Sequence, residues 1–101
     1  LVGTVQLIID QPENQPHRAD VAKLLVHPSA RRGGLARELM TELESYARQQ
    51  GKTLLVLDTA TGSGAELFYH NCGWKKVGVI PDYAQMPDGT LTGTTLFYKT
   101  L

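Results

Sequence analysis

The stretch that decides the fold reads Val26-His27-Pro28-Ser29-Ala30-Arg31-Arg32-Gly33-Gly34-Leu35-Ala36. An apolar strand pattern ends at the proline, a loop with two arginines and two glycines follows, and a long helical pattern then begins. Free N–H groups at a helix N-terminus attract anions, glycines let the backbone close around a bulky oxyanion, and arginine side chains suit phosphate. The residues therefore predict a phosphate or pyrophosphate site. The structural alternative is a turn that the two glycines make possible, with both arginine side chains exposed to solvent.

Two strands are predicted before this stretch, over Val2–Ile9 and Ala19–Val26, because both segments are rich in apolar and β-branched residues. The polar segment 11–16 carries two prolines and predicts the connection of an antiparallel hairpin. The helix after the stretch starts at Leu35 and ends before Gly51, a residue suited to the left-handed end of a helix.

This helix is expected to pack one apolar face against the core. Its apolar residues recur at spacings of three and four, as one face of a helix requires. They are Leu35, Leu39, Leu43, Tyr46 and Ala47. Glu44 and Arg48 are expected on the opposite side of the helix, as a favourable i,i+4 pair.

The second half of the chain predicts a further alternation of strands and helices. The expected elements are a buried strand over 53–58, a loop over 59–64, a short helix over 65–72, a strand over 74–80, a long loop over 81–92 and a last strand over 94–98. A Pro-Asp-Gly turn at 87–89 lies in the long loop. The order β-β-α-β-α-β-β predicts an α/β fold with a mixed, mostly antiparallel sheet and two helices.

The composition is that of an ordinary globular protein. The chain has 101 residues, 42% of them hydrophobic, and 10 basic residues balance 10 acidic ones. The length suits one domain over 1–101, and the neutral balance argues against a nucleic-acid partner. The single cysteine, Cys72, and the lack of a membrane span or signal pattern favour a cytoplasmic protein. The chain opens directly in a strand pattern, so we expect it to be the later part of a longer domain.

Better-known phosphate loops do not explain the stretch. A glycine-rich loop ending in Gly-Lys-Ser/Thr is absent, which argues against a nucleotide triphosphatase. The dinucleotide fingerprint G-x-G-x-x-G is also absent from this turn. His17 and His70 lack metal-ligand spacing with any cysteine or acid, so no metal site is predicted.

Two motifs together resemble a known family. Arg31-x-x-Gly34-x-Ala36, after Val26-x-Pro28, resembles the acetyl-CoA pyrophosphate loop of the GNAT N-acetyltransferases. Ala65-Glu66-Leu67-Phe68-Tyr69-His70-Asn71-Cys72-Gly73-Trp74 is similar to the family's second helix and the strand after it. Within the family, Leu57-Asp58-Thr59, Ile80-Pro81-Asp82-Tyr83-Ala84 and Phe97-Tyr98-Lys99 look most like the tabtoxin-resistance-type acetyltransferases. The resemblance implies the GNAT-like acyl-CoA N-acyltransferase fold without its N-terminal elements.

The resemblance implies acetyl-CoA as co-substrate and a set of residues that bind it. Backbone groups of Leu25, Val26 and His27 would pair with the pantetheine arm. The pyrophosphate would lie on the loop formed by Arg31, Arg32, Gly33, Gly34, Leu35 and Ala36. The family often carries an asparagine in the loop before the second helix, where this chain has Gly62, so Thr61 or Ser63 would supply that hydrogen bond.

The resemblance also implies direct attack of an amine on the thioester, with a base for the ammonium proton and an acid for the thiolate. Tyr69 falls on the family's tyrosine acid; its alternative role is packing alone. Asp20 is the acid residue on the strand before the loop and matches the family's base, with a water relay for its short side chain. Asp58, at the end of the buried strand, is the second candidate base, and a capping role is its alternative.

These expectations lead to one principal function and two alternatives. The principal function is transfer of the acetyl group of acetyl-CoA to a primary amine of a small molecule. The first alternative is a catalytically incomplete CoA-binding module or structural fragment that needs another chain or segment, and the second is a phosphate-binding module unrelated to CoA. No nucleic-acid or membrane partner is expected. The strand over Val2–Ile9 would be an exposed edge, so we expect a homodimer.

Overall fold

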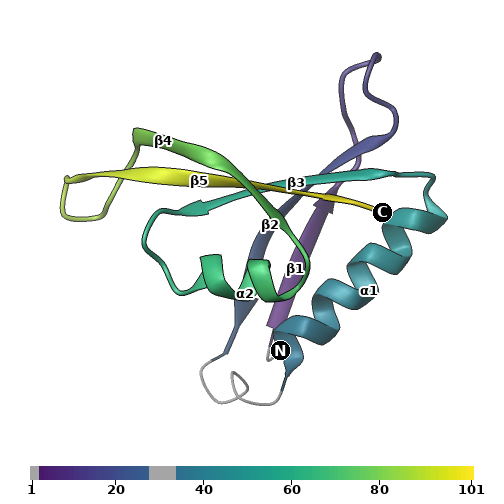
Figure 1. The fold of residues 1–101 in the computed structure, drawn as a ribbon, viewed down its shortest axis with the longest axis horizontal. Helices are drawn as coiled ribbons and strands as arrows, with labels where there is room; N and C mark the ends of the chain where they lie inside the picture. Colours follow the sequence, from purple (N-terminus) through teal and green to yellow (C-terminus); the bar gives the residue numbers. More distant parts are fainter. Residues whose placement is uncertain (1–2, 28–33) are drawn as a thin grey trace. The chain divides into compact units, whose positions relative to one another are not determined.

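The computed structural model describes residues 3–27 and 34–101, and over these residues it confirms the predicted order of elements (Figure 1). The elements are β1 (Gly3–Ile8), β2 (Arg18–Val26), α1 (Leu35–Gln49), β3 (Leu54–Ala60), α2 (Ala65–Asn71), β4 (Lys75–Gln85) and β5 (Leu91–Thr100). The five strands of the described part form a mixed sheet in the order β1-β2-β3-β5-β4. The chain divides into two compact units, one of residues 1–55 with 100–101 and one of residues 56–99.

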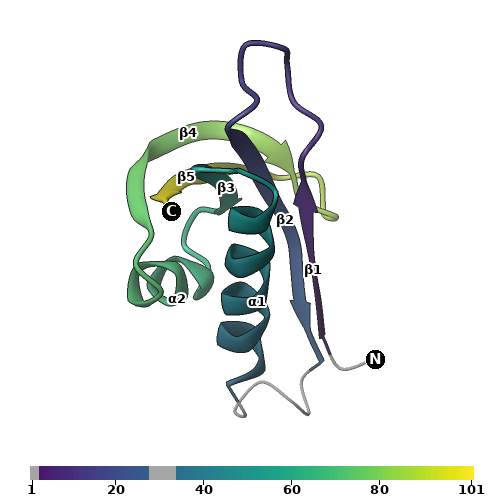
Figure 2. The ribbon, with the colours of Figure 1, turned by 90° about the vertical axis from the view of Figure 1, so that its right-hand side faces the viewer.

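The first unit is the β1–β2 hairpin with α1 packed along it (Figure 2). The two strands pair antiparallel, as the sequence predicted, and Leu7 lies opposite Val21 and Ile8 opposite Asp20. The helix approaches the first strand closely: a Cβ on Gly3 would lie 3.0 Å from Leu35 Cδ2 and 3.1 Å from Leu39 Cδ1. The buried apolar side chains of this unit are Ala19, Val21, Met40, Leu43, Ala47 and Leu55.

A β-bulge interrupts the hairpin in the second half of β2. Gln6 pairs with Ala22 and Thr4 pairs with Leu25, so two residues of β2 stand opposite Val5 alone. Lys23, the first residue of the bulge, has φ 55°. Residues other than glycine seldom adopt this left-handed backbone conformation. Bulges of this kind change the direction in which the following strand residues point.

The buried face of α1 is rotated from the face that the sequence predicted. Glu44, expected to be exposed, is only 7% exposed, whereas Tyr46, expected to face the core, is 50% exposed. The buried stripe runs through Met40, Leu43, Glu44 and Ala47, which follow the i, i+3, i+4, i+7 spacing of a helix face. The Glu44–Arg48 pair does form, with 4.0 Å between Glu44 Oε1 and Arg48 Nη2.

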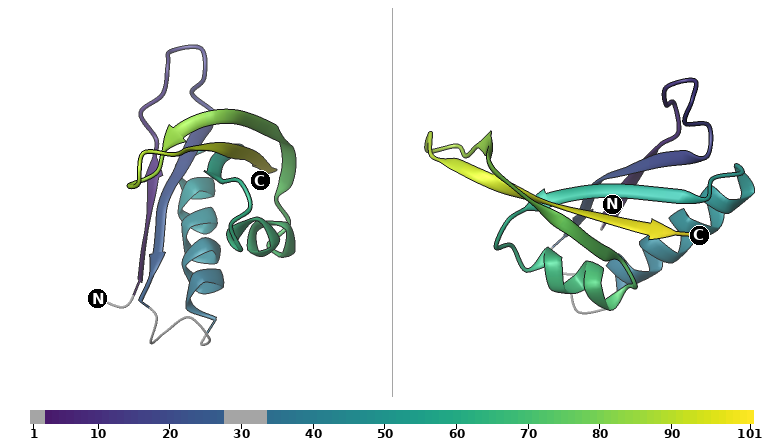
Figure 3. Two further views of the ribbon diagram at one scale, coloured as in Figure 1. Left: turned by 90° about the vertical axis from the view of Figure 1, so that its left-hand side faces the viewer. Right: turned by 45° about the horizontal axis from the view of Figure 1, so that its top comes forward.

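The second unit is built from the later part of β3, α2 and the long β4–β5 hairpin (Figure 3). Tyr69 is the centre of its aromatic core, with ring centroids 6.0 Å from Trp74 and 5.8 Å from Phe97. Gly73, with φ 88°, follows the end of α2, as the sequence predicted.

The strands of this unit extend into two segments that were predicted to be loops. Thr59 and Ala60 continue β3, and residues 81–85 and 91–92 continue the hairpin strands. Pro81 lies within β4, an edge strand with a register shift between Ile80 and Ala84, which is where a strand tolerates proline. The predicted turn at 87–89 is confirmed, because Gly89, at φ 91°, donates its N–H to the Met86 carbonyl oxygen over 2.9 Å. Neither helix of the described part is long and apolar enough to cross a membrane.

Candidate functional site

The N-terminus of α1 carries the described part of the predicted pyrophosphate loop. Gly34, at φ 75°, occupies the N-cap position and has no side chain with which to cap the helix. Its carbonyl oxygen accepts the Glu38 N–H over 3.1 Å, whereas the N–H groups of Leu35 and Ala36 lie in the first turn, where a helix has no internal partner for them. Arg31, Arg32 and Gly33, predicted for the same site, lie outside the described residues.

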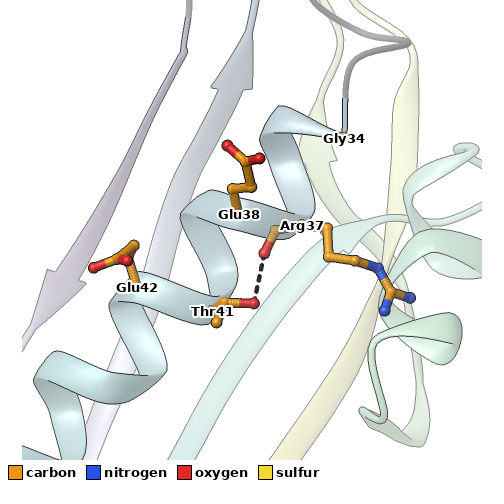
Figure 4. A pocket seen from close by; sticks show the side chains of 5 residues that line it. All are labelled: Gly34, Arg37, Glu38, Thr41 and Glu42. Atoms are coloured by element: carbon orange, nitrogen blue, oxygen red, sulfur yellow. Dashed lines mark hydrogen bonds between the residues drawn. The ribbon is translucent and has the colours of Figure 1, made fainter.

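A depression of about 490 Å³ lies along the first turns of α1 (Figure 4). Its lining residues are Gly34, Arg37, Glu38, Thr41 and Glu42. Figure 4 shows the Arg37 side chain pointing away from those of Glu38 and Glu42, and Thr41 Oγ1 donates to the Arg37 carbonyl oxygen over 2.9 Å. Arg37 therefore adds a cation beside the helix N-terminus. Arg37 was not among the predicted site residues, although it lies three residues after Gly34.

The end of β2 carries the three residues predicted to meet the pantetheine arm. Val26 pairs with Gly3 and Leu25 pairs with Thr4 in the hairpin, and His27 follows the strand. Leu25 is 62% exposed although it is a large apolar residue. These three residues follow the bulge directly.

Asp20, the first candidate base, is held on both of its carboxylate oxygens. Arg18 forms an ion pair with Oδ1, and Gln11 Nε2 donates to Oδ2 over 3.3 Å. Arg18 also donates to Gln11 and to Gln15, so the network ties both ends of the β1–β2 connection together. The arrangement gives Asp20 a structural role in the hairpin.

Asp58, the second candidate, has a different environment at the exposed side of β3. Thr94 Oγ1 donates to Asp58 Oδ2 over 2.7 Å. No other described residue bonds to this carboxylate, so Oδ1 remains open to an incoming donor. Asp58 therefore combines a fixed side chain with an available oxygen.

Hydroxyl groups hold the loop between β3 and α2. Thr61 Oγ1 lies 3.0 Å from Thr95 Oγ1, and Ser63 Oγ lies 3.3 Å from Thr59 Oγ1. The Gly62 N–H donates to Glu66 Oε2 over 2.7 Å. The two hydroxyls predicted to replace the family's asparagine, those of Thr61 and Ser63, therefore both belong to one hydrogen-bonded loop.

Tyr69 is the only tyrosine in the described core, and it is 7% exposed. Burial, and after it the charge of the neighbouring Cys72, raises the pKa of Tyr69 above its ordinary value of 10.0. The phenol is therefore protonated at neutral pH, as a proton donor must be.

Tyr69 and Asp58 lie on opposite faces of the sheet in the second unit. Successive side chains of a strand point to opposite faces. Phe97 contacts Tyr69, so the odd-numbered β5 residues 95 and 97 face α2. Thr94 points to the other face, together with the Asp58 carboxylate that it binds. The Asp58 carboxylate and the Tyr69 ring therefore approach these strands from different faces.

Comparison with known proteins decides the family. Residues 1–74 match the acetyltransferase (GNAT) family. The chain belongs to the GNAT family. Human N-acetyltransferase 8 is 35% identical to it over 80 residues, which cover 77% of this chain and 35% of that protein.

Solved structures of other proteins share the GNAT fold over 99% of this chain. A ribosomal-protein-alanine N-acetyltransferase from Brucella melitensis matches with a TM-score of 0.86 at 25% identity, over 62% of its own length. A putative acetyltransferase from Salmonella typhimurium, solved with its cofactor acetyl-CoA, matches with a TM-score of 0.88 at 20% identity, over 58% of its length. The chain therefore spans about three fifths of these structures and about a third of the human protein.

Within this GNAT chain, the structure describes most of the predicted site residues but not all of them. Those in the first unit are Asp20, Leu25, Val26, His27, Gly34, Leu35 and Ala36, and those in the second are Asp58, Ser63 and Tyr69. Two neighbours of these residues, Arg37 and Thr94, were not predicted from the sequence. Arg37 could have been suggested by its place close behind Gly34 in the sequence. Thr94 could not, because its hydrogen-bond partner Asp58 is 36 residues away.

Proposed function

We propose that this chain is the cofactor-binding part of an acetyl-CoA-dependent N-acetyltransferase that acts on a primary amine of a small molecule. The observation that supports this most strongly is the start of α1, where Gly34 in the left-handed region opens a helix without a side-chain cap. This element lies inside the segment that matches the GNAT family. Within that family we place the chain nearest the tabtoxin-resistance type, on the motifs around Asp58 and Ile80–Ala84.

The residues at the start of α1 fit the pyrophosphate of acetyl-CoA. A Cβ built on Gly34 would meet nothing within 4 Å, so the backbone is open to a bulky anion there. The first-turn N–H groups of Leu35 and Ala36 and the helix dipole favour negative charge, and Arg37 adds a cation nearby. The relative from Salmonella typhimurium, which has the same fold, holds acetyl-CoA.

The acetyl thioester supplies an electrophilic carbonyl carbon that the amine attacks directly. Asp58 accepts the proton of the substrate ammonium on Oδ1, because Thr94 occupies only Oδ2. Asp20 is the less suitable candidate for this role because Arg18 and Gln11 already bond both of its oxygens.

Tyr69 donates the proton that the departing thiolate needs. Its raised pKa keeps the phenol protonated until that proton is used. The aromatic contacts with Trp74 and Phe97 hold its ring in one orientation. We expect Tyr69→Phe to lower kcat by about a hundredfold and to leave acetyl-CoA affinity unchanged.

Calorimetric titration with acetyl-CoA tests the proposal, with ADP as the control ligand. Micromolar binding that ADP cannot match is expected. Gly34→Ala should weaken this binding, because alanine resists the left-handed conformation. Gly89→Ala is the control: it makes the same substitution at a glycine with positive φ in the β4–β5 turn and should leave the binding unchanged. Equal affinity for ADP and acetyl-CoA would indicate a phosphate-binding module instead.

An acetylation assay then separates the enzyme from a CoA-binding module. Lysine, spermidine and trialanine are offered as acceptors, and the addition of an acetyl group is followed by mass spectrometry. Transfer to any of these amines supports the enzyme. Tight acetyl-CoA binding with no transfer to any of them would favour the catalytically incomplete module.

A further inference from the structure

Thr94 binds the Asp58 carboxylate from a buried position on β5. It is 3% exposed, and its Oγ1 lies 2.7 Å from Asp58 Oδ2 and 3.2 Å from the Thr59 carbonyl oxygen. We propose that Thr94 is a positioning residue for acetyl transfer, which fixes Asp58 so that Oδ1 faces the incoming amine. This inference rests on the proposed function, in which Asp58 is the base.

A threonine at this buried position has to be explained, because its hydroxyl must be hydrogen-bonded. A buried hydroxyl is costly unless it is hydrogen-bonded, and valine has the same shape and a strong preference for strands. The threonine hydroxyl has one proton to donate, and a charged carboxylate is the stronger of its two acceptors. The shorter distance, to Asp58, agrees with this choice.

Anchoring one carboxylate oxygen restricts the rotation of the Asp58 side chain. An exposed aspartate otherwise samples several staggered rotamers, and proton transfer requires the acceptor to lie within hydrogen-bond reach of the amine. The cross-strand neighbour of Thr94 on β4 is Ile80, an apolar residue. Ile80 therefore offers no donor that would compete with the amine for Oδ1.

The test measures the kinetics of Thr94 variants with whichever of lysine, spermidine and trialanine the wild-type protein acetylates fastest. Thr94→Val removes the hydroxyl at constant shape, and Thr94→Ala removes it without filling the space, so the comparison does not depend on the folding of one variant. Thr94→Ser keeps the hydroxyl. Thr92→Val is the matched control, because Thr92 lies two residues away on the same face of β5 and pairs with Ala84.

Loss of the hydroxyl is expected to lower kcat by at least about tenfold, with the acetyl-CoA KM unchanged. Thr94→Ser should restore most of kcat, and Thr92→Val should leave it at the wild-type level. In an Asp58→Asn background, Thr94→Val should cause no further loss, because the carboxylate that it positions is already gone. A purely structural role would instead lower kcat equally in both backgrounds.

Three results would overturn the inference, and they have different meanings. If Thr94→Val and Thr94→Ala keep the wild-type kcat, or reduce it equally in the Asp58→Asn background, Thr94 does not act through Asp58. If Asp58→Asn itself keeps the wild-type kcat, the base assignment is wrong. If the wild-type protein acetylates none of the three amines, the proposed function fails, and the inference fails with it because Thr94 then has no catalytic base to position.

Discussion

Lys99 on β5 donates a hydrogen bond from Nζ to the carbonyl oxygen of Cys72, over 2.7 Å. Cys72 is the C-cap of α2, so the ammonium group satisfies a carbonyl at the negative end of the helix. α2 has only seven residues and carries Tyr69. This contact between distant parts of the sequence therefore fixes the helix that presents the proposed acid.

Replacing Lys99 with methionine is expected to destabilise the protein by about 1.5 kcal/mol, because a partly buried carbonyl loses a charged donor. The free energy of unfolding is measured by urea denaturation. Lys75→Met is the control, since Lys75 is an exposed residue at the start of β4. Equal losses in the two variants would show that the Lys99 contact contributes nothing specific.

The raised pKa of Tyr69 predicts how stability depends on alkaline pH. Burial makes the folded protein hold the phenol proton more tightly than the unfolded chain, whose tyrosine titrates at the ordinary value of 10.0. This contribution to stability is complete below about pH 10 and is lost as the pH rises through the folded-state pKa. Tyr69→Phe removes the group, so its stability should fall less steeply in this range.

Urea denaturation of both proteins at a series of pH values between about 8 and 11 checks this prediction. Below pH 9 the difference in unfolding free energy between the two should be constant, which serves as the internal control. Above that range the difference should shrink as the wild-type protein loses its contribution. If the unfolding free energies of the two proteins differ by the same amount at every pH, the raised pKa of Tyr69 is contradicted.

The features that the sequence predicted well depend on residues close together in the chain. The start of α1 at Gly34 and the helix–glycine junction at Gly73 could both be predicted because turn residues and helix ends have local signals. Tyr69 could be placed on a short helix for the same reason. Its pKa shift could not, because that shift depends on burial by the whole aromatic core.

The errors arose where distant residues decide the structure. Pro81 predicted a loop, yet it continues β4 because the strand lies at the edge of the sheet, where a missing N–H costs little. Glu44 predicted an exposed side chain, yet α1 buries it beside Met40 and Ala47. The Thr94–Asp58 bond joins two strands that are neighbours only in the folded sheet.

The two non-glycine residues with positive φ in the described part give a matched pair of stability tests. Lys23, at φ 55°, lies in the β2 bulge, and Asp82, at φ 54°, lies at the irregular part of β4. Lys23→Gly should stabilise the protein by about 1 kcal/mol, because glycine adopts this conformation without the steric cost. Asp82→Gly should gain less, because aspartate tolerates the left-handed region better than lysine.

Thermal and urea unfolding of the two glycine variants measure these gains. Lys23→Ala is the control for the loss of the lysine side chain, and it should give no stabilisation because alanine keeps the steric cost. If Lys23→Gly instead lowers the free energy of unfolding, the lysine side chain stabilises the bulge by more than the left-handed backbone conformation destabilises it.

The edge strand β1 predicts self-association. In the part of the chain that the structure describes, this strand lies at the end of the sheet. Gly3–Ile8 contains no charged residue, so the strand lacks the charges that usually protect such an edge. Val5 and Leu7 also line a groove of about 320 Å³ with α1, which includes the exposed ring of Tyr46. We expect a second copy of the chain to pair along this edge, because identical uncharged strands meet without like-charge repulsion.

Light scattering over a range of protein concentrations tests this expectation, with a mass that rises from monomer to dimer as the expected result. Val5→Lys places a charge on the edge and in the groove and should keep the protein monomeric. Gln49→Lys adds the same charge at the exposed end of α1 and should leave the dimer intact. A wild-type protein that stays monomeric at every concentration would show that β1 does not pair with its own copy.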